Sequence, residues 1–393
     1  MNIRPVAELD VWSCSTLKNS KRNSGPEPHV EGIREPIELG NFCLVGDREY
    51  VHNTSKMAYL VEPSEDICRH PNWDLNAGYE QRVPKDHSLA EKLDNLLRWI
   101  CDNVGKFRAP CDADHEKLSD LHTDFVSYRG LLATIMGSLY EEKEAWILGV
   151  TLYRGTRYLC QYETEAKRIQ ETSKPPWMKR ACAWGYKFEQ YMTSSTMGGK
   201  PTPQEPVNEK EEFCSVVRTR LGQNHSLVFG AEVDGVDESL VRRHPELRHS
   251  TRRFIELKTS REVHTARQRE NLARFKMIKW WAQSYLIGIP RVICGFRDDD
   301  GFVRRIHSFD LAELVKKGRD FWDHARMISF LDAFLTFVKI NVIEDNPKNV
   351  YLFSYVPAEQ KVKCMMLPEN HKRHSEYLIL PNWYLAHMEK HLA

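Results

Sequence analysis

The sequence shows no excess of charge of either sign. Among its 393 residues, 56 lysines and arginines face 55 aspartates and glutamates, which leaves a net charge of +1. This balance excludes a global electrostatic field that would steer a polyanion to the protein. A nucleic-acid site must therefore be a local basic patch, and the balance itself argues neither for nor against RNA.

Paired cysteines are also absent. The 10 cysteines are scattered, with no C-x-x-C pair and no Cys/His cluster at the spacing of zinc ligands. The sequence thus predicts neither a zinc site nor a disulfide framework. We expect the protein to work in a reducing intracellular compartment.

Long apolar runs are the third absence. No stretch approaches the ~20 apolar residues of a membrane span, and the N-terminal sequence lacks the apolar segment of a signal peptide. We expect a soluble protein that is not secreted. The cluster KNSKR, Lys18 to Arg22, is a candidate nuclear import signal, although such short clusters are more often solvated tail.

The composition, 41% hydrophobic and 28% charged, is that of a globular protein. Residues 1–36 are largely polar and lack periodicity, which predicts a flexible N-terminal lead-in. Neither an internal repeat nor a clean linker divides the remainder. We therefore predict a single mixed α/β catalytic domain over residues 37–393, although the length alone would allow two domains.

Hydrophobic periodicity predicts the main elements. Ser88 and Glu91 match a capping box, in which each side chain satisfies a backbone donor, so we expect a helix to begin at Ser88. The segment FVSYRGLLATIM, from Phe125, carries both strand and helix signals. The other predictions are strands at 146–153, 156–164, 226–237, 252–260, 291–296 and 302–309, helices at 175–193 and 269–288, and loops at 63–86, 198–210 and 237–252.

Two short motifs of charged residues lie on predicted strands. Because residues two apart on a strand share one face, Glu232 and Asp234 point the same way, as do Glu256 and Lys258. If the two strands are neighbours, three carboxylates and one ammonium group converge on one patch. Such clustering is costly unless a cation neutralises the carboxylates. Glu189, from the preceding helix, would complete a metal shell.

This patch suits phosphodiester hydrolysis. Hard divalent ions such as Mg²⁺ prefer oxygen ligands and bind substrate phosphate at their remaining positions. Two ions about 3.5 to 4 Å apart lower the pKa of an attacking water and stabilise the attacking and leaving oxygens. Lys258 would add a compact positive charge beside them. We therefore predict a phosphodiesterase that uses two Mg²⁺ or Mn²⁺ ions.

Each motif alone has a simpler interpretation. Alternating acids on a strand are most often a solvated face, and E-x-K is commonly an exposed ion pair. Both motifs, however, lie in the apolar segments VFGAEVDGV and FIELKT, where a solvated face would carry more polar neighbours. Together they resemble the core of the PD-(D/E)xK nucleases.

Further stretches carry a family resemblance. Between residues 37 and 303 they are, in order, ELGNF, DREY, YRG, GYKFEQY, FCSVVRTRLG, EVD, ELKTS and KWWAQSYLIGIPRVICGFRDDDGFV. Together they resemble the decapping exoribonuclease (DXO) family, which includes the fungal partners of the nuclear 5′-to-3′ exoribonuclease. The C-terminal part, including LPNWYLAHM, is similar more loosely.

The resemblance implies an α/β fold with a mixed two-sheet core of the PD-(D/E)xK nuclease type, flanked by helices, with the active site in a deep cleft. It also implies an activity at RNA 5′ ends. Incomplete or unmethylated guanosine caps, or the NAD cap, would be removed to leave a 5′-monophosphate RNA, which several members degrade in the 5′-to-3′ direction. The resemblance further implies location in the nucleus, with the cytoplasm open as well. Only some members bind an exoribonuclease, so that partner stays open.

The resemblance also assigns roles to individual residues. Lys258 and Gln283 would flank the scissile phosphate and the attacking water. The implied metal ligands are Glu189, Glu232, Asp234, Glu256 and the carbonyl of Leu257. The implied substrate contacts are Arg48, Glu91, Tyr128, Arg129, Gly130 and Cys214, together with Glu232, Lys258 and Gln283.

Several of these residues have structural interpretations as well. Arg129, followed by Gly130, suits a bidentate hydrogen bond to phosphate, but an ordinary salt bridge would explain it too. Tyr128 stands where many members have tryptophan, and either ring can stack or pack. The capping box explains Glu91 without a substrate, and packing explains Cys214.

The predicted helix over 269–288 raises the same question. Lys279 and Gln283 lie four residues apart and share a helix face, whereas Trp280 and Trp281 point elsewhere. Adjacent tryptophans more often belong to the core than to a stacking platform, so we assign both to packing. The functional interpretation of Gln283 depends on the resemblance.

Two other functions stay open. A non-catalytic RNA-end binder or scaffold would keep the fold without the chemistry, but it should show degraded metal ligands, and here they are complete. A DNA-processing nuclease of the wider PD-(D/E)xK class is the other, because metal-dependent hydrolysis does not itself select ribose.

Overall fold

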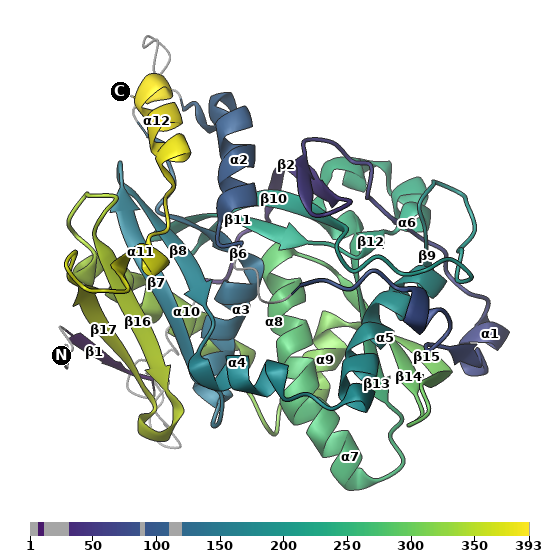
Figure 1. Ribbon diagram of the computed structural model, residues 1–393. Coiled ribbons are helices and arrows are strands. Elements are labelled where there is room, and N and C mark those ends of the chain that lie inside the picture. The colour runs from purple at the N-terminus through teal and green to yellow at the C-terminus, as the bar shows by residue number, and fades with distance from the viewer. Residues whose placement is uncertain (1–6, 12–30, 87–90, 110–119, 393) are drawn as a thin grey trace.

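The strands of the protein form two mixed sheets with helices packed against them (Figure 1). The computed structural model describes residues 7–11, 31–86, 91–109 and 120–392, so the KNSKR cluster and Ser88 lie outside it. The two-sheet α/β core predicted from the sequence is confirmed. Within the described ranges, no helix is long and apolar enough to cross a membrane.

The larger sheet has ten strands in the order β1-β17-β16-β7-β8-β6-β11-β10-β2-β3. Its strands are β1 (Ala7–Asp10), β2 (Ile37–Val45), β3 (Glu49–Val51), β6 (Phe125–Tyr128), β7 (Trp146–Tyr153), β8 (Thr156–Tyr162), β10 (Glu212–Leu221), β11 (His225–Glu232), β16 (Val350–Val356) and β17 (Lys361–Leu367). Strand β1 falls within the predicted lead-in but pairs with β17, because Ala7 and Leu9 alternate toward the core.

The smaller sheet has seven strands in the order β5-β15-β14-β13-β12-β4-β9. Its strands are β4 (Tyr59–Leu60), β5 (Trp73–Asp74), β9 (Thr193–Ser194), β12 (Gly235–Val236), β13 (Phe254–Arg261), β14 (Arg291–Arg297) and β15 (Phe302–Asp310). The predicted hairpins β7–β8 and β14–β15 are both present. Gly301, in the second turn, has a φ of +87°, which only glycine adopts readily.

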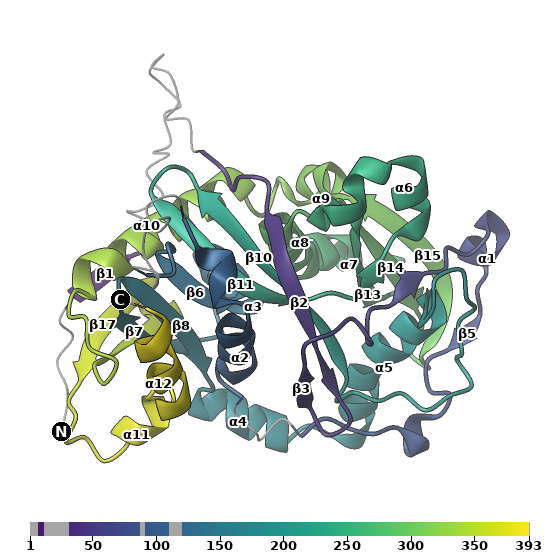
Figure 2. The ribbon, with the colours of Figure 1, turned by 90° about the horizontal axis from the view of Figure 1, so that it is seen from above.

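The α-helices have the following bounds: α1 (Glu65–Arg69), α2 (Asp94–Asp102), α3 (Arg129–Gly137), α4 (Glu165–Thr172), α5 (Pro176–Met192), α6 (Glu238–Arg243), α7 (Ala266–Asn271), α8 (Ile278–Ile287), α9 (Leu311–Gly318), α10 (His324–Asn341), α11 (His374–Tyr377) and α12 (Asn382–His391). Figures 1 and 2 show α3 and α8 between the two sheets. They pack on each other, and α10 packs on α3. Trp280 and Trp281 of α8 are buried in this central core, which confirms their assignment to packing.

The segment from Phe125, which carries both strand and helix signals, is both: β6 is followed directly by α3. Several other predicted boundaries are wrong. The predicted loop at 237–252 contains α6, whose N-cap is the side chain of Asp237, and the loop at 63–86 contains α1 and β5. The predicted helix at 269–288 is present but begins earlier, at Ala266, and consists of α7 and α8 joined by a π-helical segment, Leu272–Met277. Helices α1 and α6 bury no residues and begin at the side-chain caps Ser64 and Asp237, so local capping in polar segments, not apolar periodicity, forms them.

The expected helix start at Ser88 is also wrong. Helix α2 begins at Asp94, and its N-cap residue Leu93 makes no side-chain capping bond. Glu91 lies outside the helix, and its carboxylate instead accepts hydrogen bonds from Arg48. Because Glu91 precedes α2, it is not the third residue of that helix as a capping box requires, and an ion pair across the fold holds its carboxylate.

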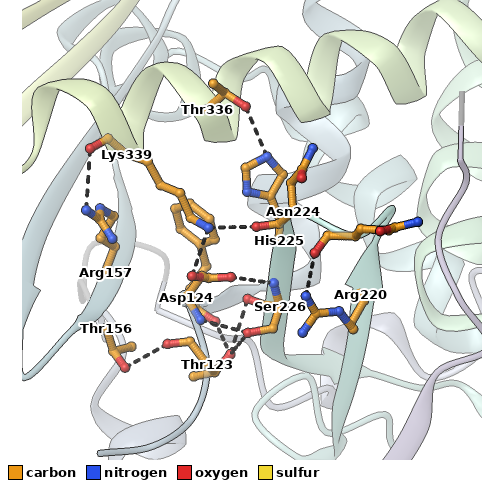
Figure 3. Close-up of polar contacts among 12 residues, drawn as sticks. Thr123, Asp124, Thr156, Arg157, Arg220, Asn224, His225, Ser226, Thr336 and Lys339 are labelled. Carbon is orange, nitrogen blue, oxygen red and sulfur yellow. Dashed lines mark hydrogen bonds and ion pairs between the residues drawn. The ribbon is translucent and has the colours of Figure 1, made fainter. Parts of the chain in front are cut away.

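A polar cluster fixes the amino ends of β6 and β11 (Figure 3). The Asp124 carboxylate accepts a hydrogen bond from the Ser226 amide at 2.7 Å and pairs with Lys339 of α10 at 2.8 Å. The buried His225 contacts the hydroxyl of Thr336 through Nε2 at 3.1 Å. The strands are parallel, so fixing their amino ends also fixes the edge at which both of them end.

Candidate active site

Two catalytic candidates lie where β6 and β11 end. The parallel register pairs Tyr128 with Gly230, so Arg129 and Glu232 follow at the same edge of the sheet. A Cβ atom on Gly230 would lie 2.8 Å from the ring of Tyr128. The absence of a side chain at Gly230 is therefore what allows Tyr128 to pack at this edge.

The strands that carry the two motifs are not direct neighbours, contrary to the condition set from the sequence. Strand β11 belongs to the larger sheet and β13 to the smaller one. The chain crosses between the sheets at Asp234 and enters β12, where Gly235 pairs with Ile255. The Asp234 carboxylate accepts a hydrogen bond from the amide of Leu257 at 2.6 Å. The motifs meet because the chain changes sheet between them.

Glu189 reaches the same place from α5, which packs on β13. Its side chain lines a pocket of about 350 Å³ together with Glu232 and Asp234. Three of the four predicted carboxylates thus open into one cavity. The fourth, Glu256, is buried behind them with 1% of its surface exposed.

Burial and mutual repulsion shift the pKa values of these carboxylates. Burial raises the pKa of Glu189 well above its usual range, and Asp234 and Glu232 add to the shift. Burial, then Glu212 and Asp234, raise the pKa of Glu232 to about 7. Glu232 is open to solvent in the pocket but is surrounded by protein, so its ionisation is still opposed. Burial and Glu256 raise the pKa of Asp234 to about 6.

Glu256 behaves in the opposite way. Burial alone would raise its pKa, but Arg129 and Lys258 outweigh that effect and lower the pKa to about 2. Nη1 of Arg129 lies 2.9 Å from the carboxylate, and Nζ of Lys258 contacts its other oxygen. Glu256 is therefore a fixed anion held by two cations.

The donor set fits a hard divalent cation, because carboxylate oxygens that oppose each other's ionisation are relieved by an ion between them. Glu189, Glu232 and Asp234 supply such oxygens around one pocket. In the described part of the chain, however, no three His, Cys, Asp or Glu side chains are already arranged to hold an ion. Metal binding would therefore have to draw these side chains together.

Arg48 stands in a second polar cluster beside the pocket. Its guanidinium binds Glu91 at 2.6 Å and Glu212 at 2.9 Å, and Lys85 binds Glu212 at 2.7 Å. The predicted substrate residues Arg48 and Glu91 are thus partners of each other. Neither Glu212 nor Lys85 was predicted from the sequence to belong to the site. Glu212 lies two residues before Cys214 on β10, on the same face, and that alternation was the available signal.

The remaining predicted substrate residues separate into two groups. Tyr128 and Gly130 line a second cavity, of about 380 Å³, together with Glu91. Cys214 pairs with Glu232 across β10 and β11, but its thiol is buried and burial raises its pKa. The structure therefore supports the packing interpretation for the thiol of Cys214.

Gln283 is the predicted site residue with the least structural support. It is partly buried on α8, and its side chain makes no hydrogen bond with any described residue. It is also not among the residues that line the catalytic pocket. Its place beside the scissile phosphate, like the metal role of the Leu257 carbonyl, stays a prediction.

Comparison with known proteins gives a family match and close relatives. Residues 34–385 match the family described as RAI1 like PD-(D/E)XK nuclease. The decapping and exoribonuclease protein of Bos taurus is 37% identical over 92% of this chain and 86% of its own length. The human protein of the same name is 36% identical, over 94% and 88%. The decapping and exoribonuclease protein Rai1 of Drosophila melanogaster is 31% identical, over 90% and 91%.

Solved structures share the fold. Scheffersomyces stipitis Rai1 superposes with a TM-score of 0.78 at 22% identity, covering 92% of this chain and 99% of its own. Candida albicans Rai1, solved with pU5 and Mn²⁺, gives a TM-score of 0.77 at 20% identity, covering 91% and 96%. At these identities the likeness supports the two-sheet architecture.

Proposed function

Because the chain belongs to the family of RAI1-like PD-(D/E)XK nucleases, we propose that it is a metal-dependent hydrolase of RNA 5′ ends. It removes NAD caps and incomplete guanosine caps, leaves a 5′-monophosphate RNA and degrades that RNA from the 5′ end. The observation that carries the proposal is the pocket in which Glu189, Glu232 and Asp234 meet. Relatives named for decapping and exoribonuclease activity, and the relative solved with pU5 and Mn²⁺, support the substrate class.

The residues divide the work of hydrolysis. Glu189, Glu232, Asp234 and Glu256 would hold Mg²⁺ or Mn²⁺, which when bound supplies an activated water and charge stabilisation at phosphorus. Lys258 would hold the phosphoryl oxygens, since its side chain is more exposed than that of Glu256, which it contacts, and its ammonium keeps its charge. Water adds to phosphorus, and the bond to the cap oxygen breaks. The cap leaves with that oxygen and one proton, and the 5′ phosphate stays on the RNA.

The position of Arg129 refines its predicted role. Its guanidinium is almost fully buried and is bound to Glu256, so in this state it fixes a carboxylate. A phosphate near Arg129 would share the guanidinium with Glu256. Arg129 therefore positions the acidic cluster whether or not it also contacts substrate.

A panel of short RNAs tests the function. The RNAs carry NAD, unmethylated guanosine cap, triphosphate, monophosphate or hydroxyl 5′ ends and are incubated with Mg²⁺ or Mn²⁺. We expect release of intact NAD or cap by the wild type and none by the Glu232→Ala/Asp234→Ala variant. Inert RNAs with both metals would favour the scaffold function, and cleavage of matched DNA alone would favour a DNA nuclease.

We also propose that the protein acts in the nucleus and joins a 5′-to-3′ exoribonuclease there. The support is the family resemblance, and the KNSKR cluster at residues 18–22 is the candidate import signal to test. Fluorescence microscopy of the wild type and of a Lys18→Ala/Lys21→Ala/Arg22→Ala variant tests the first part. Copurification of the tagged protein with an exoribonuclease from nuclear extract tests the second, and its absence would leave the chain acting alone.

A further inference from the structure

A basic groove adjoins the catalytic pocket. Its volume is about 830 Å³, and residues 82–86, α4 and α5 supply most of its lining. Six lysines and arginines line it against four carboxylates, whereas one lysine and six carboxylates line the catalytic pocket. The protein thus has almost no net charge, but it carries an acidic cavity and a basic cavity side by side.

The two cavities meet at Tyr186, which lines both of them. Helix α5 connects them physically. Lys179, Ala183 and Tyr186 follow one another at helical spacing along the groove, and Glu189 continues the helix into the catalytic pocket. Lys179 is ten residues before Glu189, so about 15 Å of helix separates them. A chain that leaves the catalytic pocket along α5 enters the groove.

Two of the cations are available for a ligand. Arg82 and Lys85 pair with Glu209 and Glu212 at 3.2 and 2.7 Å. Lys167 of α4 and Lys179 of α5 are exposed, and neither side chain forms an ion pair with any described residue. Figure 2 shows α4 and α5 on the same side of the molecule.

We propose that this groove binds the body of a single-stranded RNA, with Lys167 and Lys179 holding backbone phosphates beyond the first nucleotide. The substrate class rests on the proposed function, and the groove adds the path that the rest of the RNA takes. Single-stranded nucleic acid is commonly bound in a positively charged groove that follows its backbone. These lysines position the substrate and do not act on the reacting atoms.

The test compares three variants. Lys167→Ala/Lys179→Ala removes both charges, and Lys167→Arg/Lys179→Arg keeps them. Lys316→Ala/Lys372→Ala is the matched control, since both lysines are exposed and neither lines the groove. Binding of a labelled 5′-monophosphate RNA of about twelve nucleotides, within the usual range of such sites, is measured by fluorescence anisotropy in EDTA, which prevents hydrolysis.

We expect the alanine groove variant to bind about tenfold more weakly at 0.1 M salt, because two phosphate contacts are lost. The magnitude of its slope of log affinity against log salt should fall by about 1.4, or about 0.7 for each contact. The arginine variant and the control should bind like the wild type. With metal, KM for the long RNA should rise while kcat, and KM for a 5′-monophosphate dinucleotide, stay unchanged.

The outcomes separate the two proposals. If the alanine groove variant binds the long RNA as tightly as the wild type, with the same salt slope, the groove is not an RNA site, whatever the enzyme hydrolyses. If the groove variant loses affinity while the wild type hydrolyses none of the RNA substrates, the groove stands and the proposed function fails. An equal loss of RNA affinity in the control variant would also overturn the proposal, since the effect would then come from the change in net charge.

Discussion

The guanidinium of Arg129 lies 2.9 Å from the carboxylate of Glu256, and the two side chains retain only 8% and 1% of their accessible surface. Lys258 contacts the other oxygen of the same carboxylate. This buried triad joins the start of α3 in the core to β13 of the smaller sheet. The triad therefore connects the part of the catalytic site that is carried by α3 to the part that is carried by the smaller sheet.

Removing Arg129 should destabilise the protein. In Arg129→Met, Glu256 stays buried with Lys258 as its one remaining cation, so we expect the free energy of unfolding to fall by about 3 kcal/mol. Guanidinium chloride denaturation followed by fluorescence measures this loss. The double variant Arg129→Met/Glu256→Gln should recover part of it, because the fully buried carboxylate is no longer charged, while Lys258 retains 26% of its side-chain surface in contact with solvent. If Arg129→Met were as stable as the wild type, Lys258 alone would be enough to stabilise the buried charge of Glu256.

Asp234→Asn should abolish hydrolysis without unfolding the protein. The asparagine oxygen can still accept the hydrogen bond from the Leu257 amide, whereas the charge available to a cation is lost. We expect kcat/KM to fall by at least about a hundredfold, since even residues that merely orient metal ligands cost 10–100-fold when changed. Gel assays of RNA hydrolysis measure the loss, and circular dichroism is the control. Substantial activity of this variant would contradict the predicted role of Asp234 as a metal ligand.

Metal affinity should increase as the pH rises. A carboxylate must be deprotonated to bind a metal, and the pKa values of Glu232 and Asp234 are raised to about 7 and about 6. Both groups are therefore partly protonated at pH 6 and charged at pH 8. At pH 6, one unit below the pKa of Glu232, protonation should weaken binding about tenfold.

Calorimetric titration of Mn²⁺ at several pH values, in buffers of different ionisation enthalpy, measures both the affinity and the protons released. Glu232→Gln should bind more weakly and depend less on pH. An affinity that does not change between pH 6 and 8 would contradict the role of these carboxylates.

Acid should destabilise the fold through His225. Burial lowers the pKa of His225, and Lys339 adds to that shift. Nδ1 is buried and has no hydrogen-bond partner in the described structure, so the neutral ring is favoured. The unfolded chain binds the proton more readily, so the contribution of His225 is complete above its ordinary pKa and is lost as the pH falls through the lowered value.

Thermal denaturation of the wild type and of His225→Gln between pH 7.5 and 5 tests this prediction. Glutamine can still donate to Thr336 but does not titrate, so the advantage of the wild type over the variant should shrink as the pH falls. Other titrating groups, including carboxylates with raised pKa values, cancel in the comparison. A constant difference would show that His225 does not change protonation on unfolding.

The motifs of the site were predictable because they depend on local geometry. Strand alternation places Glu232 and Asp234 on one side of the chain, and helix periodicity correctly predicts α5, which carries Glu189. The hairpins β7–β8 and β14–β15 follow from short turns between apolar segments. The assumption that β11 and β13 are neighbours failed, because the order of strands in a sheet is not a local property.

The sequence by itself determined which chemistry is available: carboxylates in two strand motifs, a lysine beside them and no overall excess of either charge. Only the tertiary structure decided which groups face one another. Arg129 and Glu256 are 127 residues apart, and Arg48 and Glu212 are 164 apart, so no periodicity pairs them. The same folding brings an acidic pocket beside a basic groove, because burial and neighbouring charges, which set ionisation, arise only when distant segments pack together.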